Sequence, residues 1–238
     1  MSNIDTLVKG VRDLNINLDS NQEESFIRYK ELLKKWNEKI NITTITDDVE
    51  IDQKHFLDSL TPLTTSLFNG EKSLIDIGTG GGFPGIPLKI ANPDLNVLLL
   101  DSLNKRIIFL NEVVKELGLK NIEALHGRAE ELSCNPMYRE KFDICISRAV
   151  AQLNTLGEYC MPFVKVGGHF ISMKGPDVKE ELEISKKAIK LLGGQLIDTV
   201  YIKIPQSDIV HSLIIIEKIR ETPTKYPRGG GKPRKNPL

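Results

Sequence analysis

Apolar residues recur at helical spacing near the start of the chain. Over Glu23–Ile40 they lie three and four positions apart, which predicts an amphipathic helix with Asp19–Ser20 as the capping candidates. A second apolar pattern covers Ile51–Leu63, and Asn69–Gly70 ends it. We therefore expect residues 1–70 to form a helical region without strands.

After this region, short apolar runs alternate with helical patterns, which is typical of βαβ units and a parallel sheet. The expected strands are Ser73–Ile77, Asn96–Asp101, Ile122–His126, Phe142–Ser147 and His169–Lys174. The expected helices are Gly85–Ala91, Lys105–Leu117, Leu153–Phe163 and Val178–Leu192. Two more strands, Gln195–Ile202 and Leu213–Lys218, follow without a helix between them and should form a hairpin whose last strand is inserted antiparallel. Residues 71–219 are thus predicted to be a doubly wound, seven-stranded, Rossmann-like α/β domain.

The last segment, residues 220–238, differs in composition. Thr222–Leu238 contains four prolines and three consecutive glycines, so we expect a tail that is mobile in isolation. From Lys218 onwards seven Lys or Arg residues accompany one acid, although the whole chain has a net charge of zero. A basic end on a neutral body can hold RNA locally. The candidate RNA-binding residues are Arg228, Lys232, Arg234 and Lys235.

Composition excludes several other classes of protein. No apolar stretch approaches the roughly 20 residues that span a bilayer, and the first 20 residues lack a signal-peptide core. Cys134, Cys145 and Cys160 have no CxxC spacing and the histidines are scattered, so we expect neither a disulfide framework nor a metal site. A cytoplasmic monomer is the expectation.

A glycine-rich turn follows the first expected strand and carries the strongest functional signal. Residues 78–85 read Gly-Thr-Gly-Gly-Gly-Phe-Pro-Gly and lead into a helix. Glycines permit positive φ and close approach of a ligand to the backbone, and amides at a helix start can face a carboxylate or a phosphate. A turn without a ligand is the alternative, but its position between the first strand and first helix favours a nucleotide-type cofactor.

Spacing alone does not identify that cofactor. Gly80 to Gly85 fits the dinucleotide pattern, whereas Gly78, Gly80 and Gly82 fit the GxGxG of methyltransferases. Asp76 favours S-adenosyl-L-methionine, because a carboxylate before the turn can orient the methionyl amino group, directly or through water. The terminal hairpin also favours the methyltransferase version of the fold, since a dehydrogenase more often continues with another βαβ unit.

Three further strand ends supply candidates for the same site. Asp101 ends the second strand, where it can accept both ribose hydroxyls or else cap the following helix. Ala129 and Glu130 follow the third strand, where adenine would lie, although Glu130 could be an exposed acid. Arg148 ends the fourth strand and is either a surface residue or a fixed cation between cofactor and substrate.

Six motifs and the tail together resemble the bacterial glucose-inhibited division protein B family, the small-subunit (16S) ribosomal RNA guanine-N7 methyltransferases. The resemblance spans nearly the whole chain. Its motifs are WNEKINIT (36–43), HFLDSL (55–60), DIGTGGGFPGIP (76–87), DSLNKR (101–106), RAE (128–130), SRAVA (147–151) and YPRGGGKPRKNPL (226–238). The resemblance implies that the methyl donor contacts Gly78, Phe83, Ala129, Glu130 and Arg148.

The chemistry implied by the resemblance needs no general base. Guanine N7 has an in-plane lone pair, so catalysis would come from alignment with the methyl group, and Arg148 would be a positioning residue. Deletion of residues 222–238 should then weaken RNA binding and leave donor binding intact. The motif leaves open which residues hold the guanine and what His55, Asp58 and Ser59 do. A nicotinamide-dependent oxidoreductase and a non-catalytic RNA-binding module are the alternatives.

Overall fold

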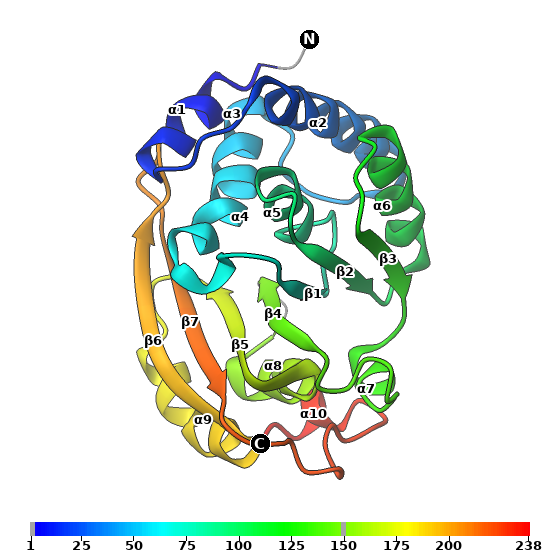
Figure 1. The fold of residues 1–238 in the computed structure, drawn as a ribbon, viewed down its shortest axis with the longest axis vertical. Helices are drawn as coiled ribbons and strands as arrows, with labels where there is room; N and C mark the ends of the chain where they lie inside the picture. Colours follow the sequence, from blue (N-terminus) through cyan, green and yellow to red (C-terminus); the bar gives the residue numbers. More distant parts are fainter. Residues whose placement is uncertain (1–2, 149–150) are drawn as a thin grey trace.

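One seven-stranded sheet forms the centre of the molecule (Figure 1). The computed structural model describes residues 3–148 and 151–238, so Ala149 and Val150 of the SRAVA motif lie outside the described residues. The strands are β1 (Ser73–Ile77), β2 (Asn96–Asp101), β3 (Ile122–His126), β4 (Phe142–Arg148), β5 (Val164–Lys174), β6 (Gly194–Lys203) and β7 (Val210–Lys218). Their order is β3-β2-β1-β4-β5-β7-β6, with β7 antiparallel to β5 and β6. The predicted doubly wound fold, with its last strand inserted antiparallel, is confirmed.

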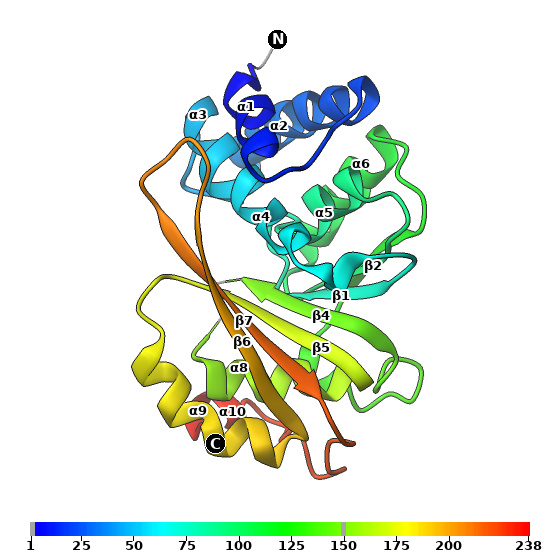
Figure 2. The ribbon, with the colours of Figure 1, turned by 60° about the vertical axis from the view of Figure 1, so that its left-hand side comes forward.

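Helices cover both faces of the sheet (Figure 2). On one face lie α5 (Gly85–Ala91) and α6 (Asn104–Glu116), with the N-terminal helices α1 (Asp5–Asp13) and α2 (Ser20–Ile40) packed beyond them. On the other lie α8 (Leu153–Cys160), the 3₁₀ turn η4 (Met161–Phe163) and α9 (Lys179–Leu191). Each face has its own hydrophobic core, because β-strand side chains alternate between the two sides.

Helix α2 follows the apolar pattern of its sequence. Asp19 accepts a hydrogen bond from the Gln22 amide, and the Gln22 side chain returns one to the Asp19 amide, which completes a capping box. Phe26, Tyr29 and Leu33 are fully buried. They share one hydrophobic core with α5, α6 and the sheet, so the N-terminal helices are built onto the α/β domain.

The second apolar pattern forms an irregular helical path toward the sheet. It runs through α3 (Asp48–Ile51), the π-helix η1 (Asp52–Leu57), α4 (Asp58–Leu60), and the 3₁₀ turns η2 (Thr61–Thr64) and η3 (Ser66–Phe68). Buried polar side chains on this path have partners elsewhere: Asp52 pairs with Lys30 of α2 at 2.6 Å, and both side chains are buried. Single turns of π-helix are often found at functional sites.

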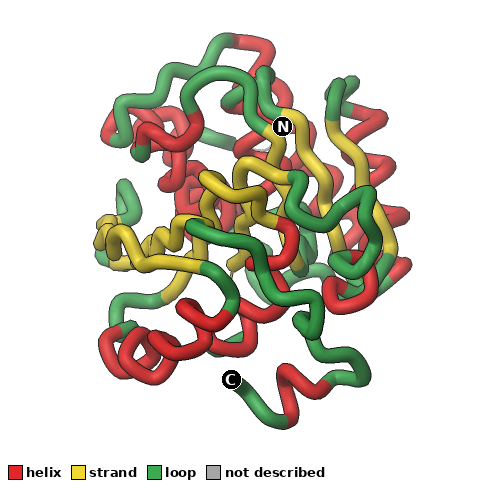
Figure 3. The backbone as a smooth tube through the Cα atoms, turned by 60° about the horizontal axis from the view of Figure 1, so that its bottom comes forward, coloured by secondary structure: helices red, strands yellow, loops and turns green. Residues whose placement is uncertain are grey.

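The expectation of a mobile tail is wrong. Residues 220–238 pack along the α8 side of the sheet and include the short helix α10 (Lys232–Lys235) before the C-terminus (Figure 3). Tyr226 is 7% exposed, and the Arg228 guanidinium binds the buried Glu158 carboxylate. Composition suggested disorder because prolines and glycines dominate, but tertiary contacts from α8 fix the segment.

Candidate functional site

The glycine-rich turn curls around the end of β1. Gly78, Gly80 and Gly82 have φ angles of 70°, 62° and 96°, which L side chains rarely adopt. The amides of Gly78 and Thr79 both donate to the Leu100 carbonyl of β2, at 2.8 and 3.1 Å. The turn is therefore held against β2 while part of its backbone remains open to a cavity.

That cavity, which we call the loop cavity, has a volume of about 400 Å³. Its walls come from the glycine turn, the end of β2, Arg148 of β4 and the two N-terminal motifs. The lining residues are Ile42, Thr43, His55, Gly78, Thr79, Gly80, Gly81, Phe83, Asp101, Ser102, Arg106 and Arg148. Five of the motifs that are far apart in the sequence therefore meet in one place, at the carboxyl end of parallel strands, where doubly wound sheets bind ligands.

Asp101 links the loop cavity to a second one. Its buried carboxylate accepts hydrogen bonds from the amides of Gly80 and Leu103, both at 2.9 Å, and from Arg106 at 3.0 Å. It thus braces the glycine turn and, through Leu103, the start of α6. The side chain lines both cavities, and its contact with a ribose stays a prediction.

The second cavity, which we call the α7 cavity, has a volume of about 430 Å³. It shares Gly78, Asp101 and Ser102 with the loop cavity and continues toward α7 (Ala129–Leu132). Ala129 and Glu130 form part of its wall, as the sequence predicts for the adenine end of a nucleoside. Tyr159 of α8 and three tail residues, Gly231, Arg234 and Lys235, complete it.

Arg148 is fixed from several directions at the edge of the loop cavity. One guanidinium nitrogen donates to Asp58 Oδ2 at 2.8 Å and to the Lys54 carbonyl at 2.9 Å. The guanidinium carbon lies 5.2 Å from the Phe83 ring centroid, within cation–π range. Arg148 is only 15% exposed in its side chain, which rules out a freely mobile surface arginine.

His55 forms a flat wall beside Arg148. Its ring stacks on Phe83 with the centroids 4.4 Å apart and 12° between the planes. The Thr43 hydroxyl lies 2.8 Å from His55 Nε2. Burial, followed by the nearby charge of Arg148, lowers the pKa of His55 to about 4, so the ring is neutral at pH 7.

Asp58 connects Arg148 of β4 to the start of β7. Its carboxylate is 1% exposed and also bonds His211 Nδ1 of β7, at 2.7 Å. Burial raises the pKa of Asp58, but the hydrogen bond from His211 and the charge of Arg148 outweigh burial and hold it below its usual value. A third cavity of about 450 Å³, the β7 cavity, lies here and shares His55 and Arg148 with the loop cavity.

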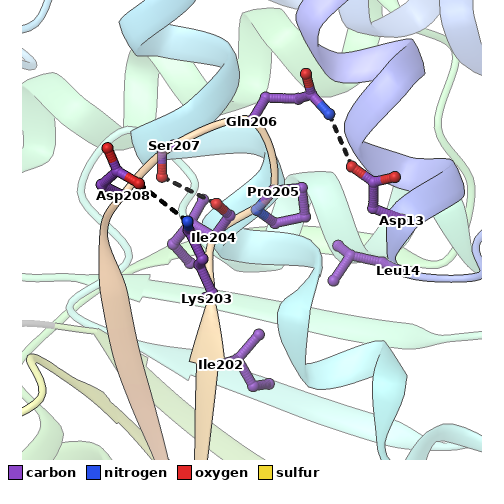
Figure 4. A pocket seen from close by; sticks show the side chains of 9 residues that line it. All are labelled: Asp13, Leu14, Ile202, Lys203, Ile204, Pro205, Gln206, Ser207 and Asp208. Atoms are coloured by element: carbon purple, nitrogen blue, oxygen red, sulfur yellow. Dashed lines mark hydrogen bonds and ion pairs between the residues drawn. The ribbon is translucent and has the colours of Figure 1, made fainter.

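A fourth cavity lies between the end of α1 and the β6–β7 turn (Figure 4), and it shares no lining residue with the other three cavities. Gln206 reaches across it to Asp13 at 2.7 Å, while Lys203 pairs with Asp208 of its own turn at 2.9 Å. These polar groups are satisfied by one another, and the remaining walls are aliphatic. The cavity lies where two elements meet at the surface. Its lining contains no cluster of reactive groups.

Residues 3–148 and 151–238 contain neither a membrane-spanning helix nor a group of metal ligands. No helix there has the length and apolar character that crossing a membrane requires. No three His, Cys, Asp or Glu residues are grouped so that they could hold a metal ion.

Comparison with known proteins identifies the family. The family model described as rRNA small subunit methyltransferase G (GidB) matches residues 22–210. The chain is 52% identical over 232 residues to the Ribosomal RNA small subunit methyltransferase G of Alkaliphilus metalliredigens, covering 98% of this chain and 97% of that protein. The protein of the same name from Acetivibrio thermocellus is 54% identical, covering 98% and 95%. The chain belongs to the rRNA small subunit methyltransferase G family.

A solved structure supports the methyltransferase fold. M. jannaschii TYW2 in complex with AdoMet superposes with a TM-score of 0.52 at 17% identity, over 68% of this chain and 77% of that one. At this identity the likeness concerns the fold alone. S-adenosylmethionine is the methyl donor of this family, and the loop and α7 cavities are the candidates for its binding site in this chain.

Asp76 of this family member has surroundings that would suit the methionyl end of that donor. Asp76 is fully buried behind the turn, where its Oδ2 accepts from the Thr79 hydroxyl at 2.7 Å and the Gly85 amide at 2.9 Å. Its Oδ1 is buried and has no hydrogen-bond partner among the described residues. A methionyl ammonium group would satisfy such an oxygen. Asp76 does not line either cavity, so its contact with the donor stays a prediction.

The structure brings together most of the predicted site residues of this methyltransferase. Gly78, Gly80, Phe83, Asp101 and Arg148 surround the loop cavity, and Ala129 and Glu130 surround the α7 cavity. The predicted RNA-binding residues separate instead. Arg228 is committed to Glu158, Lys232 is exposed, and Arg234 and Lys235 border the α7 cavity.

Sequence reasoning missed several residues that line these cavities. Thr43, Arg106, Tyr159 and His211 belong to this group. The WNEKINIT and DSLNKR motifs contain Thr43 and Arg106, so the resemblance pointed to those segments. Tyr159 and His211 gave no local signal, because only the packing of α8 and β7 against the sheet brings them to the site.

Proposed function

We propose that this chain transfers the methyl group of S-adenosylmethionine to N7 of a guanine in small-subunit ribosomal RNA, acting as a cytoplasmic monomer. The observation that carries the proposal is the meeting of the loop, α7 and β7 cavities around Asp101 and Arg148. Two of the cavities suit the two ends of the donor, and the third provides a place for the target nucleotide.

Donor binding is assigned to the shared wall of the loop and α7 cavities. Asp101 faces both, so a ribose beside it would leave the adenine near Ala129 and Glu130. The methionyl end would then lie along the glycine turn and Phe83. Bound in this way, the donor supplies a sulfonium-activated methyl group.

The target base is assigned to the side of Arg148 and His55 that faces the β7 cavity. Guanine N7 attacks with an in-plane lone pair and loses no proton, so no general base is needed, and alignment of the reactants is the main requirement. Arg148 is held rigidly by Asp58 and Lys54, which makes it suited to fixing a phosphate or the donor. A base in a stacked duplex could not reach this position, which favours an unpaired nucleotide.

The electrostatics of His55 are compatible with a cationic product. Methylation at N7 places a positive charge on the guanine, and a second cation against its face would oppose the reaction. With a pKa of about 4, His55 carries no charge at pH 7 and presents a flat, neutral ring. Arg148 is instead paired with the Asp58 carboxylate.

Transfer of labelled methyl from S-adenosylmethionine to small-subunit rRNA tests the proposal directly. Digestion to nucleosides should place the label in 7-methylguanosine. Label in another nucleoside would refute the N7 assignment, and absence of transfer would favour a non-catalytic RNA-binding module. In a parallel thermal-shift measurement S-adenosylhomocysteine should raise the unfolding temperature and NAD should not, whereas the reverse would favour an oxidoreductase.

Arg148 variants test its positioning role. We expect Arg148→Ala to lower kcat/KM at least tenfold, because the variant loses the fixed cation between the cavities. Arg148→Lys is the matched control, since it keeps the charge and loses the planar fork, and it should recover only part of the activity. Thermal unfolding of both variants checks that they fold. If Arg148→Ala left both donor affinity and turnover unchanged, the assignment would be wrong.

A further inference from the structure

The C-terminal segment is anchored on α8 by a buried ion pair. Glu158 is fully buried, and its carboxylate accepts from the Arg228 amide at 2.7 Å, from Arg228 Nε at 2.9 Å and from a terminal guanidinium nitrogen at 2.7 Å. A bidentate arginine–carboxylate pair of this kind is geometrically demanding, and breaking a buried one is costly. The anchor therefore determines where the following ten residues lie.

Two more hydrogen bonds guide the chain after this anchor. The Thr155 hydroxyl donates to the Pro233 carbonyl at 3.2 Å, and the Asn154 side chain donates to the Leu238 carbonyl at 3.3 Å. Pro233 is buried. Two consecutive residues of α8, with Glu158 about one turn later, thus hold the C-terminal segment beside the sheet, and α10 contacts α8 (Figure 1).

The docked segment becomes a wall of the α7 cavity. Gly231, Arg234 and Lys235 line it together with Ala129, Glu130 and Tyr159. Burial raises the pKa of Tyr159, the charges of Glu130 and Glu158 raise it further, and the charge of Arg234 lowers it. The charges of an acid on α7 and of a cation in the tail thus act on one phenol at the cavity that all three residues line.

The chemistry of this wall suits a purine nucleoside. A guanidinium plane and a tyrosine ring are both flat surfaces on which a purine can stack. Glu130 supplies an acceptor for an exocyclic amino group, and Ala129 leaves room for the ring. The ribose would remain at Asp101, which lines the same cavity.

We propose that residues 229–238 form part of the S-adenosylmethionine site, with Arg234 and Lys235 closing the adenosine end of the α7 cavity. This inference rests on the proposed function for the identity of the ligand. It replaces the expectation that the tail serves RNA alone. Deletion of the tail should then weaken donor binding as well as RNA binding.

The test uses isothermal titration of S-adenosylhomocysteine into the full-length protein and its variants. Arg234→Ala is expected to weaken binding about fivefold, as loss of one stacking or polar contact does. Lys232→Ala is the matched control, because Lys232 is an exposed cation of the same short helix that does not line the cavity, and its affinity should equal that of the wild type. A chain that ends at Gly230, which keeps the Arg228 anchor, should show at least the loss of Arg234→Ala.

Adenosine as a second ligand locates the contact. If the tail touches the adenosine end, Arg234→Ala should weaken adenosine binding by the same factor as S-adenosylhomocysteine binding. Equal affinities of the wild type, Arg234→Ala and the shortened chain for S-adenosylhomocysteine would overturn the inference and return the tail to RNA binding alone. Failure of the wild type itself to bind would instead refute the proposed function. Circular dichroism of each variant confirms that differences in affinity do not come from unfolding.

Discussion

Asp76 is a buried carboxylate whose hydrogen bonding is incomplete among the described residues. It is fully buried, one oxygen holds the glycine turn, and the other is unpartnered among the described residues. Burial raises its pKa to about 6, although hydrogen bonds from Thr79 and Gly85 act in the opposite direction. Without a cation beside it, ionisation costs stability as the pH rises from 3.8 through 6.

A positively charged amino group of the donor would reverse that cost. We expect the affinity for S-adenosylhomocysteine to increase by about tenfold per pH unit as the pH rises toward 6, and to level off above it. Asp76→Asn should remove this dependence, because the amide keeps an acceptor for the turn and carries no charge. Titration calorimetry between pH 5 and 7.5 measures both. A wild-type affinity that is flat over this interval would exclude Asp76 from donor binding.

At the scale of elements, the β6–β7 hairpin depends on a buried lysine at its end. Lys218 is fully buried at the end of β7, and its ammonium group donates to the Met161 carbonyl at 2.7 Å, to the Val164 carbonyl at 3.1 Å and to the Thr222 hydroxyl at 2.8 Å. Glu140 lies 2.9 Å from the same group. One side chain thus connects β7 to η4, to the start of β5 and to the tail.

Removing this ammonium group should loosen all of these connections. Lys218→Met is expected to lower the free energy of unfolding by about 3 kcal/mol, because several buried acceptors and Glu140 lose their partner while the apolar stem is retained. Urea denaturation measures the change. Lys187→Met, an exposed lysine of α9, is the matched control and should change stability by less than about 0.5 kcal/mol. Equal midpoints for the two variants would contradict the role of Lys218.

At the scale of the whole molecule, Asp58 joins three segments that are far apart in the sequence. It lies on α4 of the N-terminal region, and it binds Arg148 at the end of β4 and His211 of β7. The hydrogen bond that His211 donates to Asp58 raises the pKa of His211 above 6.5, whereas burial and the charge of Arg148 lower it. The N-terminal helices are thus joined to the edge of the sheet that carries Arg148 by charge as well as by the shared core.

The effect of Asp58→Asn can be predicted with its sign. The pKa of His211, followed by NMR, should fall from above 6.5 to below it, because the groups that lower it remain.

The raised pKa of His211 stabilises the fold below pH 6.5, and that contribution is lost as the pH rises through the raised value. The lowered pKa of Asp58 stabilises the fold above pH 3.8. The stability lost in Asp58→Asn should therefore be greatest between these values.

Asp177→Asn is the control for that experiment, because Asp177 is exposed and distant in sequence from the cluster. Its unfolding free energy should follow the wild type at every pH. A His211 pKa that does not move in Asp58→Asn would show that the 2.7 Å contact contributes nothing in solution.

The sequence by itself determined the fold class, the antiparallel last strand and the glycine turn. These follow from local patterns, since strand and helix periodicities, capping residues such as Asp19 and glycines at positive φ are each encoded within a few residues. Gly78, Asp101, Ala129 and Arg148 could be placed at one edge because parallel strands end together.

Only the tertiary structure decided how that edge is closed. His211 and Tyr159 reach the site through β7 and α8, and Asp58 gains its function from Arg148, which is 90 residues away in the sequence. The tail shows the same limit most plainly: prolines, glycines and cations predict disorder, yet buried Glu158 of α8 holds Arg228 and directs Arg234 to the α7 cavity. Local composition cannot reveal such an arrangement, because the stabilising partners are brought together only when the sheet and its helices have packed.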